Sequence, residues 1–183
     1  IQNVTEALRL MEMSYGTDHP YLMRPLLGLG QARARLGRAT EARANLERAV
    51  AVADRLGVVD EQLGRTLEEL GELAAATDPA RARGLYERAV EVHAAASGKD
   101  SAAQAAAMLR AGELAAQLND PAAAMRWFER VLELPASAEV TVRPAAAVQL
   151  TKQLVDKPEA TARLCDLLAE ADRKSTRLNS SHQ

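Results

Sequence analysis

The glycines of this chain recur at a fixed interval, and that interval is the strongest constraint on how the chain folds. Six of the ten glycines fall into two sets with a spacing of 41 residues. They are Gly30, Gly71 and Gly112 in one set, and Gly16, Gly57 and Gly98 in the other. The pentapeptide GELAA also occurs twice, beginning at Gly71 and at Gly112. A period of this length indicates structural repeats, each of which buries its apolar face by stacking on its neighbours.

Apolar residues within each period follow the spacing of an α-helix. The segments EARANLERAV, RARGLYERAV and AAMRWFERVL align so that an alanine is followed by apolar residues four and seven positions later, which places all three on one helical face. These residues are Ala42, Leu46 and Ala49; Ala82, Tyr86 and Ala89; and Ala124, Phe128 and Val131. An earlier helix leads into each glycine of the first set. Each repeat is therefore predicted to be a helix–turn–helix hairpin.

Two features define the predicted geometry of the hairpins. Asp78 and Asp120 are suited to cap the second helices, and each precedes a proline, which is tolerated at the first helical position because no amide donor is needed there. The glycine at 30, 71 or 112 is expected to face the alanine at 42, 82 or 124, so that the two helix axes approach closely.

Gln104 is expected to be an exposed position and Arg48 to lie on the convex face.

Composition supports an all-α fold. Ala, Leu, Arg and Glu dominate, aromatic residues make up only 3%, and runs of Val, Ile and Thr are nearly absent.

The repeated motifs resemble the tetratricopeptide repeat. The resemblance rests on Leu29-Gly30, Leu70-Gly71 and the alanine-to-aromatic steps Ala82–Tyr86 and Ala124–Phe128, and it covers about residues 17–135. The large aromatic residue usual three positions after the glycine is replaced by Arg33, Ala74 and Ala115. The period of 41 resembles the longer, kinesin-light-chain-like variety, in which SYGTDHPYL (14–22) is a familiar style of turn. The resemblance implies a right-handed superhelical solenoid.

The period divides the chain into six predicted segments. They are 1–16, the second helix of a truncated repeat; 17–57, 58–98 and 99–138, three repeats; 139–171, a degenerate fourth repeat; and 172–183, a non-native tail. Residues 172–182 resemble one translated frame of a common sequencing-library adapter, so this chain is interpreted as a conceptual translation of a metagenomic fragment.

The sequence offers no pattern typical of catalysis, and the fragment itself is predicted to be non-catalytic, without metal or cofactor. His19 and His93 lack partners at metal-ligand spacing, Cys165 is the only cysteine, and GLG at 28–30 does not follow a strand as a phosphate loop would. A net charge of −2 gives no electrostatic case for nucleic acid or an anionic membrane. A cytoplasmic location is expected.

The resemblance implies a concave groove, lined by the first helix of each repeat, that holds a peptide or a partner protein. The corresponding positions in this chain are Arg24, Leu27, Gln31, Arg35, Arg65, Glu68, Glu72, Leu109, Glu113 and Gln117, together with Ala76 and Ala106. Leu27 and Glu72 stand where a clamp for a terminal carboxylate would need Lys and Asn, which argues against that ligand. The groove is expected to run from basic to acidic, with apolar contacts at Leu27 and Leu109.

Three functional hypotheses remain open at this point. The first is an interaction scaffold, bacterial because Arg greatly outnumbers Lys, 19 to 4. The second is a regulatory region of a larger signalling protein, because residues 19–50 resemble repeats found in bacterial serine/threonine kinases and transcriptional regulators. The third is self-association through the repeat ends, giving a homo-oligomer.

Overall fold

The structure is a computed structural model, and it describes residues 2–96, 101–134, 142–154 and 169. These residues form eight α-helices and one 3₁₀ turn, with no strand among them. The helices are α1 (Gln2–Tyr15), α2 (Met23–Arg35), α3 (Ala39–Leu56), α4 (Glu61–Ala75), α5 (Pro79–Ala96), α6 (Ala102–Gln117), α7 (Pro121–Glu133) and α8 (Val142–Leu154), and the turn η1 (Pro20–Leu22) precedes α2. The all-α prediction is confirmed.

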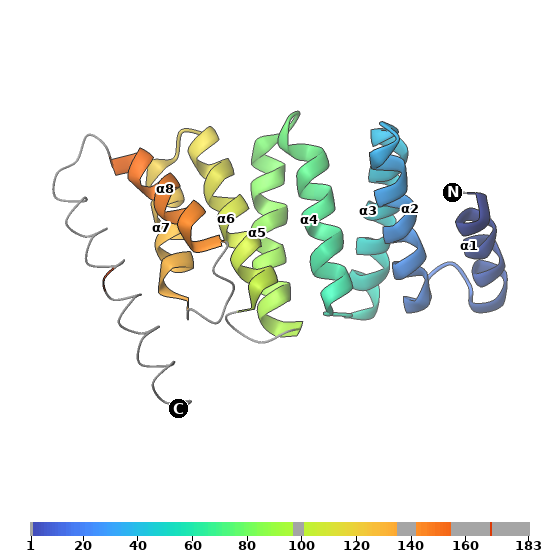
Figure 1. The fold of residues 1–183 in the computed structure, drawn as a ribbon. Coiled ribbons are helices and arrows are strands. Elements are labelled where there is room, and N and C mark those ends of the chain that lie inside the picture. The colour runs from blue at the N-terminus through green and yellow to red at the C-terminus, as the bar shows by residue number, and fades with distance from the viewer. Residues whose placement is uncertain (1, 97–100, 135–141, 155–168, 170–183) are drawn as a thin grey trace, which may run out of the picture. The chain divides into compact units, whose positions relative to one another are not determined.

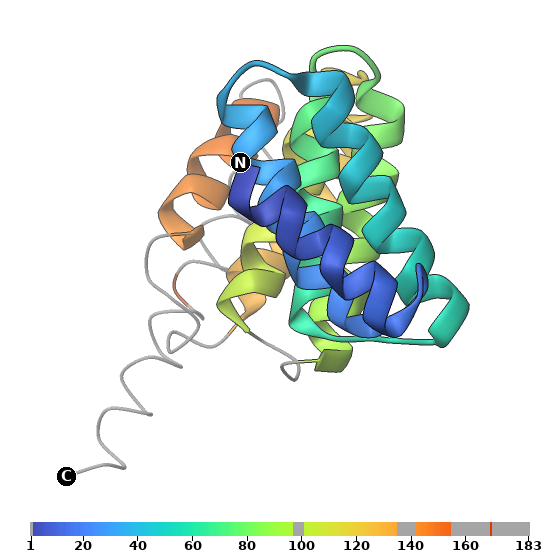
Figure 2. The ribbon, with the colours of Figure 1, turned by 90° about the vertical axis from the view of Figure 1, so that its right-hand side faces the viewer.

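The chain divides into two compact units. Unit 1 spans Ile1–Ser97 and contains α1 to α5, whereas unit 2 spans Gly98–Gln183 and contains α6 to α8. In unit 1, α2 packs against α3 and α4 packs against α5, which gives the two predicted hairpins (Figure 1). Helix α1 packs against α2 and η1 and lies beside the α2–α3 hairpin (Figure 2). In unit 2, α7 packs against both α6 and α8.

Each glycine of the first set forms a close contact with the second helix of its hairpin. A Cβ atom on Gly71 would lie 2.6 Å from Cε2 of Tyr86, and one on Gly112 would lie 2.5 Å from Cε1 of Phe128. Gly30 faces Leu46 in the same way. The expected close approach of the helices is therefore present, and the atoms nearest to a Cβ built on each glycine belong to the large residue of the neighbouring helix, which occupies the space that the missing Cβ leaves. The alanines at 42, 82 and 124 are fully buried nearby.

Local sequence explains where the helices begin and end. The Asp120 carboxylate accepts a hydrogen bond from the backbone N–H of Ala123 at 3.0 Å and caps α7, and Asp78 accepts one from Arg81 N–H at 3.0 Å. Asp60 caps α4 through the N–H of Leu63 at 2.8 Å. The second glycine set ends helices: Gly16 and Gly57 have φ values of 84° and 63°, the left-handed region that glycine tolerates. Gly98 lies outside the described residues.

Ion pairs connect the second helices of successive repeats in unit 1. Helix α3 carries two acid–arginine doublets one heptad apart, at residues 47–48 and 54–55. The arginines of these two doublets pair with carboxylates that precede α2 in the sequence. The acidic residues of the doublets pair with arginines of α5. The four pairs are Arg48–Glu12, Arg55–Asp18, Arg81–Glu47 and Arg88–Asp54. Arg48 therefore has an ion-pair partner, so reversing its charge would disturb the contact between α1 and α3.

Gln104 corrects a sequence prediction. Its side chain is only 6% exposed, in the first turn of α6, where its N–H donates to the capping Ser101 hydroxyl at 3.2 Å. The alanine-rich sequence around it gives no periodic contrast that would distinguish a buried position from an exposed one.

Three predictions concern segments outside the described residues: Cys165, the second helix of the degenerate repeat 139–171 apart from residue 169, and the tail 172–183.

Candidate functional site

The predicted groove residues of unit 1 lie on α2 and α4, apart from Ala76 directly after α4, and five of them are exposed, including Ala76. Arg24 and Arg35 stand near the two ends of α2, and Arg65 and Glu72 lie on α4. The structure places Arg24 and Arg65 around one small polar pocket of about 250 Å³, together with Asp60, Glu61 and Gln62. Arg65 pairs with Glu61 at 2.6 Å.

Leu27 differs from its expected role. It is only 8% exposed and packs in an apolar cluster with Leu46 and Leu70. The adjacent hairpin covers it, because Leu70 of α4 reaches the same cluster. Leu27 therefore belongs to the core of unit 1 and offers little surface to a ligand.

Gln31 and Glu68 are half-buried, and both face protein neighbours. Gln31 Nε2 donates to Glu69 Oε1 at 2.8 Å, which ties α2 to α4. Glu68 Oε1 lies 3.4 Å from Nε2 of His93 on α5.

The remaining predicted residues lie in unit 2, on α6. Leu109 is half-buried and Gln117 is exposed at the end of the helix. Glu113 accepts from Arg110 at 3.0 Å and from Gln149 Nε2 of α8 at 3.5 Å. The structure thus gathers Arg24 and Arg65 at one site of unit 1 and places Leu109, Glu113 and Gln117 on α6 of unit 2.

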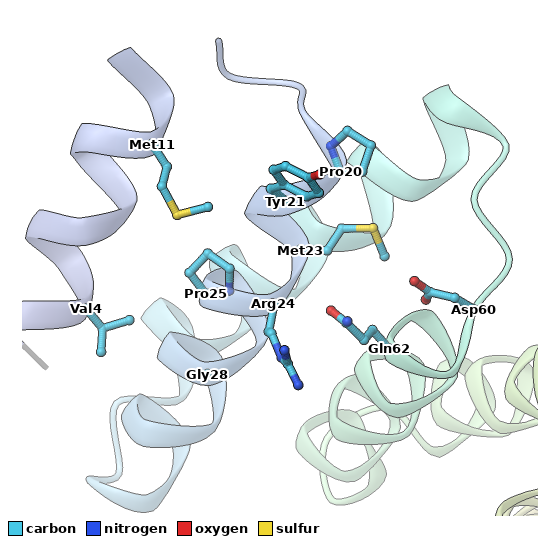
Figure 3. Close-up of a pocket in the computed structure, with 10 residues that line it drawn as sticks. All are labelled: Val4, Met11, Pro20, Tyr21, Met23, Arg24, Pro25, Gly28, Asp60 and Gln62. Carbon is cyan, nitrogen blue, oxygen red and sulfur yellow. The ribbon is translucent and has the colours of Figure 1, made fainter. Parts of the chain in front are cut away.

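A larger pocket of unit 1 was not predicted from sequence. It has a volume of about 750 Å³ and lies beside α2, with α1 on one side and the start of α4 on the other (Figure 3). Most of its lining is apolar. The lining residues are Val4, Met11, Pro20, Tyr21, Met23, Arg24, Pro25, Gly28, Asp60 and Gln62. This volume is within the range typical of ligand-binding pockets.

Gly28 lines this pocket on α2. Unlike Gly30, two residues later, it is exposed, and a Cβ atom built on it would meet no atom within 4 Å. A glycine inside a helix costs about 1 kcal/mol relative to alanine, and at Gly28 no packing contact accounts for that cost. Any larger side chain here would project into space that the pocket now offers.

The apolar pocket and the small polar pocket adjoin each other. They share Arg24, Asp60 and Gln62. The Asp60 side chain caps the N-terminus of α4 by accepting from the Leu63 N–H. The exposed Arg24, in contrast, presents a guanidinium with five N–H donors. The combined site is therefore an apolar pocket with the Arg24 guanidinium at its edge.

Tyr21 lines the pocket and belongs to a small cluster of rings. Tyr21 is 62% exposed, and its ring meets His19 at 4.6 Å and Tyr15 at 5.7 Å between centroids. The His19 Nδ1 atom accepts from the N–H of Tyr21 and fixes the turn. Tyrosine is enriched among the residues that contribute most of the binding energy at protein interfaces. The sequence identified SYGTDHPYL only as a turn between repeats, and nothing in it indicated that α1 and α4 complete a pocket beside Tyr21.

The pKa shifts that the structure resolves lie on the surface of α1. The hydrogen bond from Arg9 lowers the pKa of Glu6, and the same contact raises the pKa of Arg9. Neither residue lines the pocket.

The part of the chain that the structure describes has neither a cluster of metal ligands nor a helix that could span a membrane. No group of three or more His, Cys, Asp or Glu side chains in this part of the chain is arranged to hold a metal ion. None of the described helices is long and apolar enough to cross a membrane.

Comparison with known proteins gives one family match and several structural ones. A family model described as tetratricopeptide repeat matches residues 1–55 and 62–136. BtubC (BKLC) from P. vanneervenii has a TM-score of 0.71 at 18% identity, over 98% of this chain and 71% of that one. A Podosopora anserina protein with nearly identical TPR-like repeats of the kinesin light chain kind has a TM-score of 0.70 at 17% identity, over 95% and 86% of the two chains. A single-substitution variant of that protein gives 0.71 at 17%, over 95% and 85%. A search of the curated proteins gives no significant match.

Proposed function

Because the chain belongs to the tetratricopeptide repeat family, whose repeats generally mediate protein–protein interaction, we propose that unit 1 binds an extended segment of a partner protein on its α2–α4 face. The observation that carries the proposal is the apolar pocket of about 750 Å³ beside the polar pocket at Arg24 and Arg65. A binding role, without catalysis, is what this chemistry supports.

The two pockets suggest how a peptide would be held. An apolar side chain of the partner would enter the apolar pocket beside Gly28. An acidic group of the partner, next to that side chain, would face Arg24. Burying a large apolar side chain contributes about 1.5–3 kcal/mol, whereas an exposed ion pair contributes about 0.2–1 kcal/mol. The apolar anchor would therefore provide most of the affinity, and the charge would set orientation and association rate.

Filling the pocket tests this assignment directly. Peptides are selected on the parent chain from a random display library, and their affinities for the parent, Gly28→Leu and Gly84→Leu are compared. Gly84 is the matched control, because it is also an exposed helical glycine with no atom within 4 Å of a built Cβ. Loss of the anchor predicts about 10- to 100-fold weaker binding for Gly28→Leu alone. Equal binding by the two variants, or a failure of the parent to enrich any peptide, would contradict the proposal.

Charge is tested by a second pair of variants. Arg24→Glu is expected to weaken the same peptides by about 2- to 5-fold and to reduce their salt sensitivity, because one exposed contact is worth less than about 1 kcal/mol. Arg126→Glu, an exposed site on α7, should change neither quantity. A loss common to both variants would mean that Arg24 has no special role.

The wider setting of this function is a proposal from composition. The excess of Arg over Lys supports a bacterial source, and a cytoplasmic scaffold fits the peptide-binding role. The coding sequence upstream of Ile1 tests this reading: a kinase or regulator domain there would make the same face part of a regulatory region.

A further inference from the structure

The second repeat contains a buried histidine that has no hydrogen-bond partner. His93 of α5 is 0% exposed, and within the described residues neither Nδ1 nor Nε2 has a partner. A neutral imidazole carries one donor and one acceptor, and buried polar groups are nearly always satisfied. A histidine whose ring nitrogens form no hydrogen bond requires an explanation, since an apolar residue would fill the space without that cost.

The space for the imidazole comes from Gly64 on α4. A Cβ atom on Gly64 would lie 2.7 Å from both ring nitrogens of His93, so the ring lies directly on the helix backbone. In the repeat register, Gly64 corresponds to Met23 and His93 to Ala53. The first repeat therefore has a large residue on its first helix and a small one on its second, and the second repeat has the reverse. This exchange roughly conserves volume while it introduces a titratable group.

Glu68 is the acidic group at ion-pair distance from this imidazole. It follows Gly64 by one turn of α4, its Oε1 lies 3.4 Å from Nε2 of His93, and its side chain is 27% exposed. Glu68 therefore stands at the boundary between the interior of the hairpin and the α4 surface. The corresponding residue of the first repeat, Leu27, is apolar and buried.

The other charged groups of α3, α4 and α5 in this region have other partners or face solvent. On α3, Asp54 pairs with Arg88, and on α4, Glu61 pairs with Arg65. Glu91 on α5 and Glu72 on α4 are exposed.

We infer that His93 and Glu68 form a pH-sensitive pair, in which protonation of the buried imidazole draws the Glu68 carboxylate from the α4 surface into the hairpin. An unperturbed histidine changes charge near pH 6.5. A neutral His93 leaves Glu68 free to present its charge at the surface. A protonated His93 needs a counter-charge in its apolar surroundings, and Glu68 reaches it by a small side-chain movement.

The pair has a consequence for ligand binding, and this consequence rests on the proposed function. Glu68 is one of the predicted groove residues, so acidification would withdraw one negative charge from the α4 face. The pair itself is a property of the free protein and is tested there, so its failure is distinguishable from the failure of peptide binding.

The test is the thermal midpoint of the full chain at pH 7.5 and pH 5.5, for the parent, Glu68→Gln and Glu72→Gln. Glu72 is the matched control, being an exposed acid on the same helix. A buried charge without a counter-charge is unfavourable, so in Glu68→Gln a fall in pH favours the unfolded chain, in which the imidazole is solvated. The unfolded state then gains protons as pH falls below about 6.5, and folding stability falls with pH. Glu68→Gln should therefore lose about 3–6 °C more than the parent between the two pH values, and Glu72→Gln should follow the parent.

Two further measurements fix the interpretation. In Glu68→Gln/His93→Gln the additional loss should disappear, because the titrating group is gone. In the parent, NMR should show the Glu68 carboxyl signal moving together with the His93 ring signals as pH is lowered, and this readout needs no variant to fold. A Glu68→Gln profile parallel to the parent, or a Glu68 signal that is independent of His93, would overturn the inference.

Discussion

Replacing Gly71 with alanine tests the packing on which the hairpins depend. A Cβ atom at this position would lie 2.6, 2.9 and 3.1 Å from three ring atoms of Tyr86, which is only 6% exposed. Carbon atoms pack at about 3.5–4.0 Å, so the ring or the helix would have to move by about 1 Å. An aromatic ring in a packed interior has few alternative positions. Gly71→Ala should therefore destabilise the protein through overpacking.

Gly84→Ala is the matched control within the same hairpin. Gly84 is an exposed residue in the middle of α5, and a Cβ atom there meets nothing within 4 Å. Both substitutions remove a helical glycine, and each gains up to about 1 kcal/mol of helix propensity. Overpacking at Gly71 costs about 1–3 kcal/mol, so the free energies of unfolding of the two variants should differ by about that amount, with Gly84→Ala the more stable.

Urea denaturation of the parent and both variants measures this difference. A third comparison isolates the contact: in a Tyr86→Ala background, Gly71→Ala should no longer be destabilising, because the ring is absent. If Gly71→Ala stabilised the protein as much as Gly84→Ala does, the glycine period would have no packing role in the hairpins.

Two other predictions concern stability. Ala82→Leu should lower the free energy of unfolding by about 1–3 kcal/mol, because Ala82 is fully buried. Ala80→Leu, at an exposed site of α5, should change it by less than about 0.5 kcal/mol. Equal urea midpoints for the two variants would place the buried face of α5 elsewhere. A double-mutant cycle on Asp54 and Arg88 should give a coupling of about 0.2–1 kcal/mol that shrinks at about 1 M salt, because the pair is exposed; a coupling that salt does not affect would show that the pair acts through packing.

Features set by spacing along the chain could be predicted from the sequence. The 41-residue glycine period indicated the hairpins, because a glycine repeated inside a helix needs a packing reason. The carboxylates of Asp78 and Asp120 indicated helix starts, because capping depends only on the next few residues. Burial of Ala82 and Ala124 followed from helical spacing.

Features set by contacts between repeats could not be predicted in this way. Leu27 occupies a groove position by register, but Leu70 of the adjacent hairpin covers it. Spacing along the sequence matches Gly71 with an alanine, whereas only the relative rotation of the two helices shows that the Tyr86 ring lies nearest to it. The pocket at Gly28 requires α1, α2 and α4 together, and no periodicity within one helix reports that arrangement.

NMR chemical-shift mapping of a library-selected peptide on the isotope-labelled full chain is the most direct test of the proposed binding face. We expect the largest amide shifts at the residues around the pocket, such as Tyr21, Arg24, Gly28 and Gln62, and we expect these shifts to be lost in Gly28→Leu. Shifts that gather instead on the ion-paired faces of α3 and α5, around Arg55 and Arg88, with the pocket residues unchanged, would contradict it.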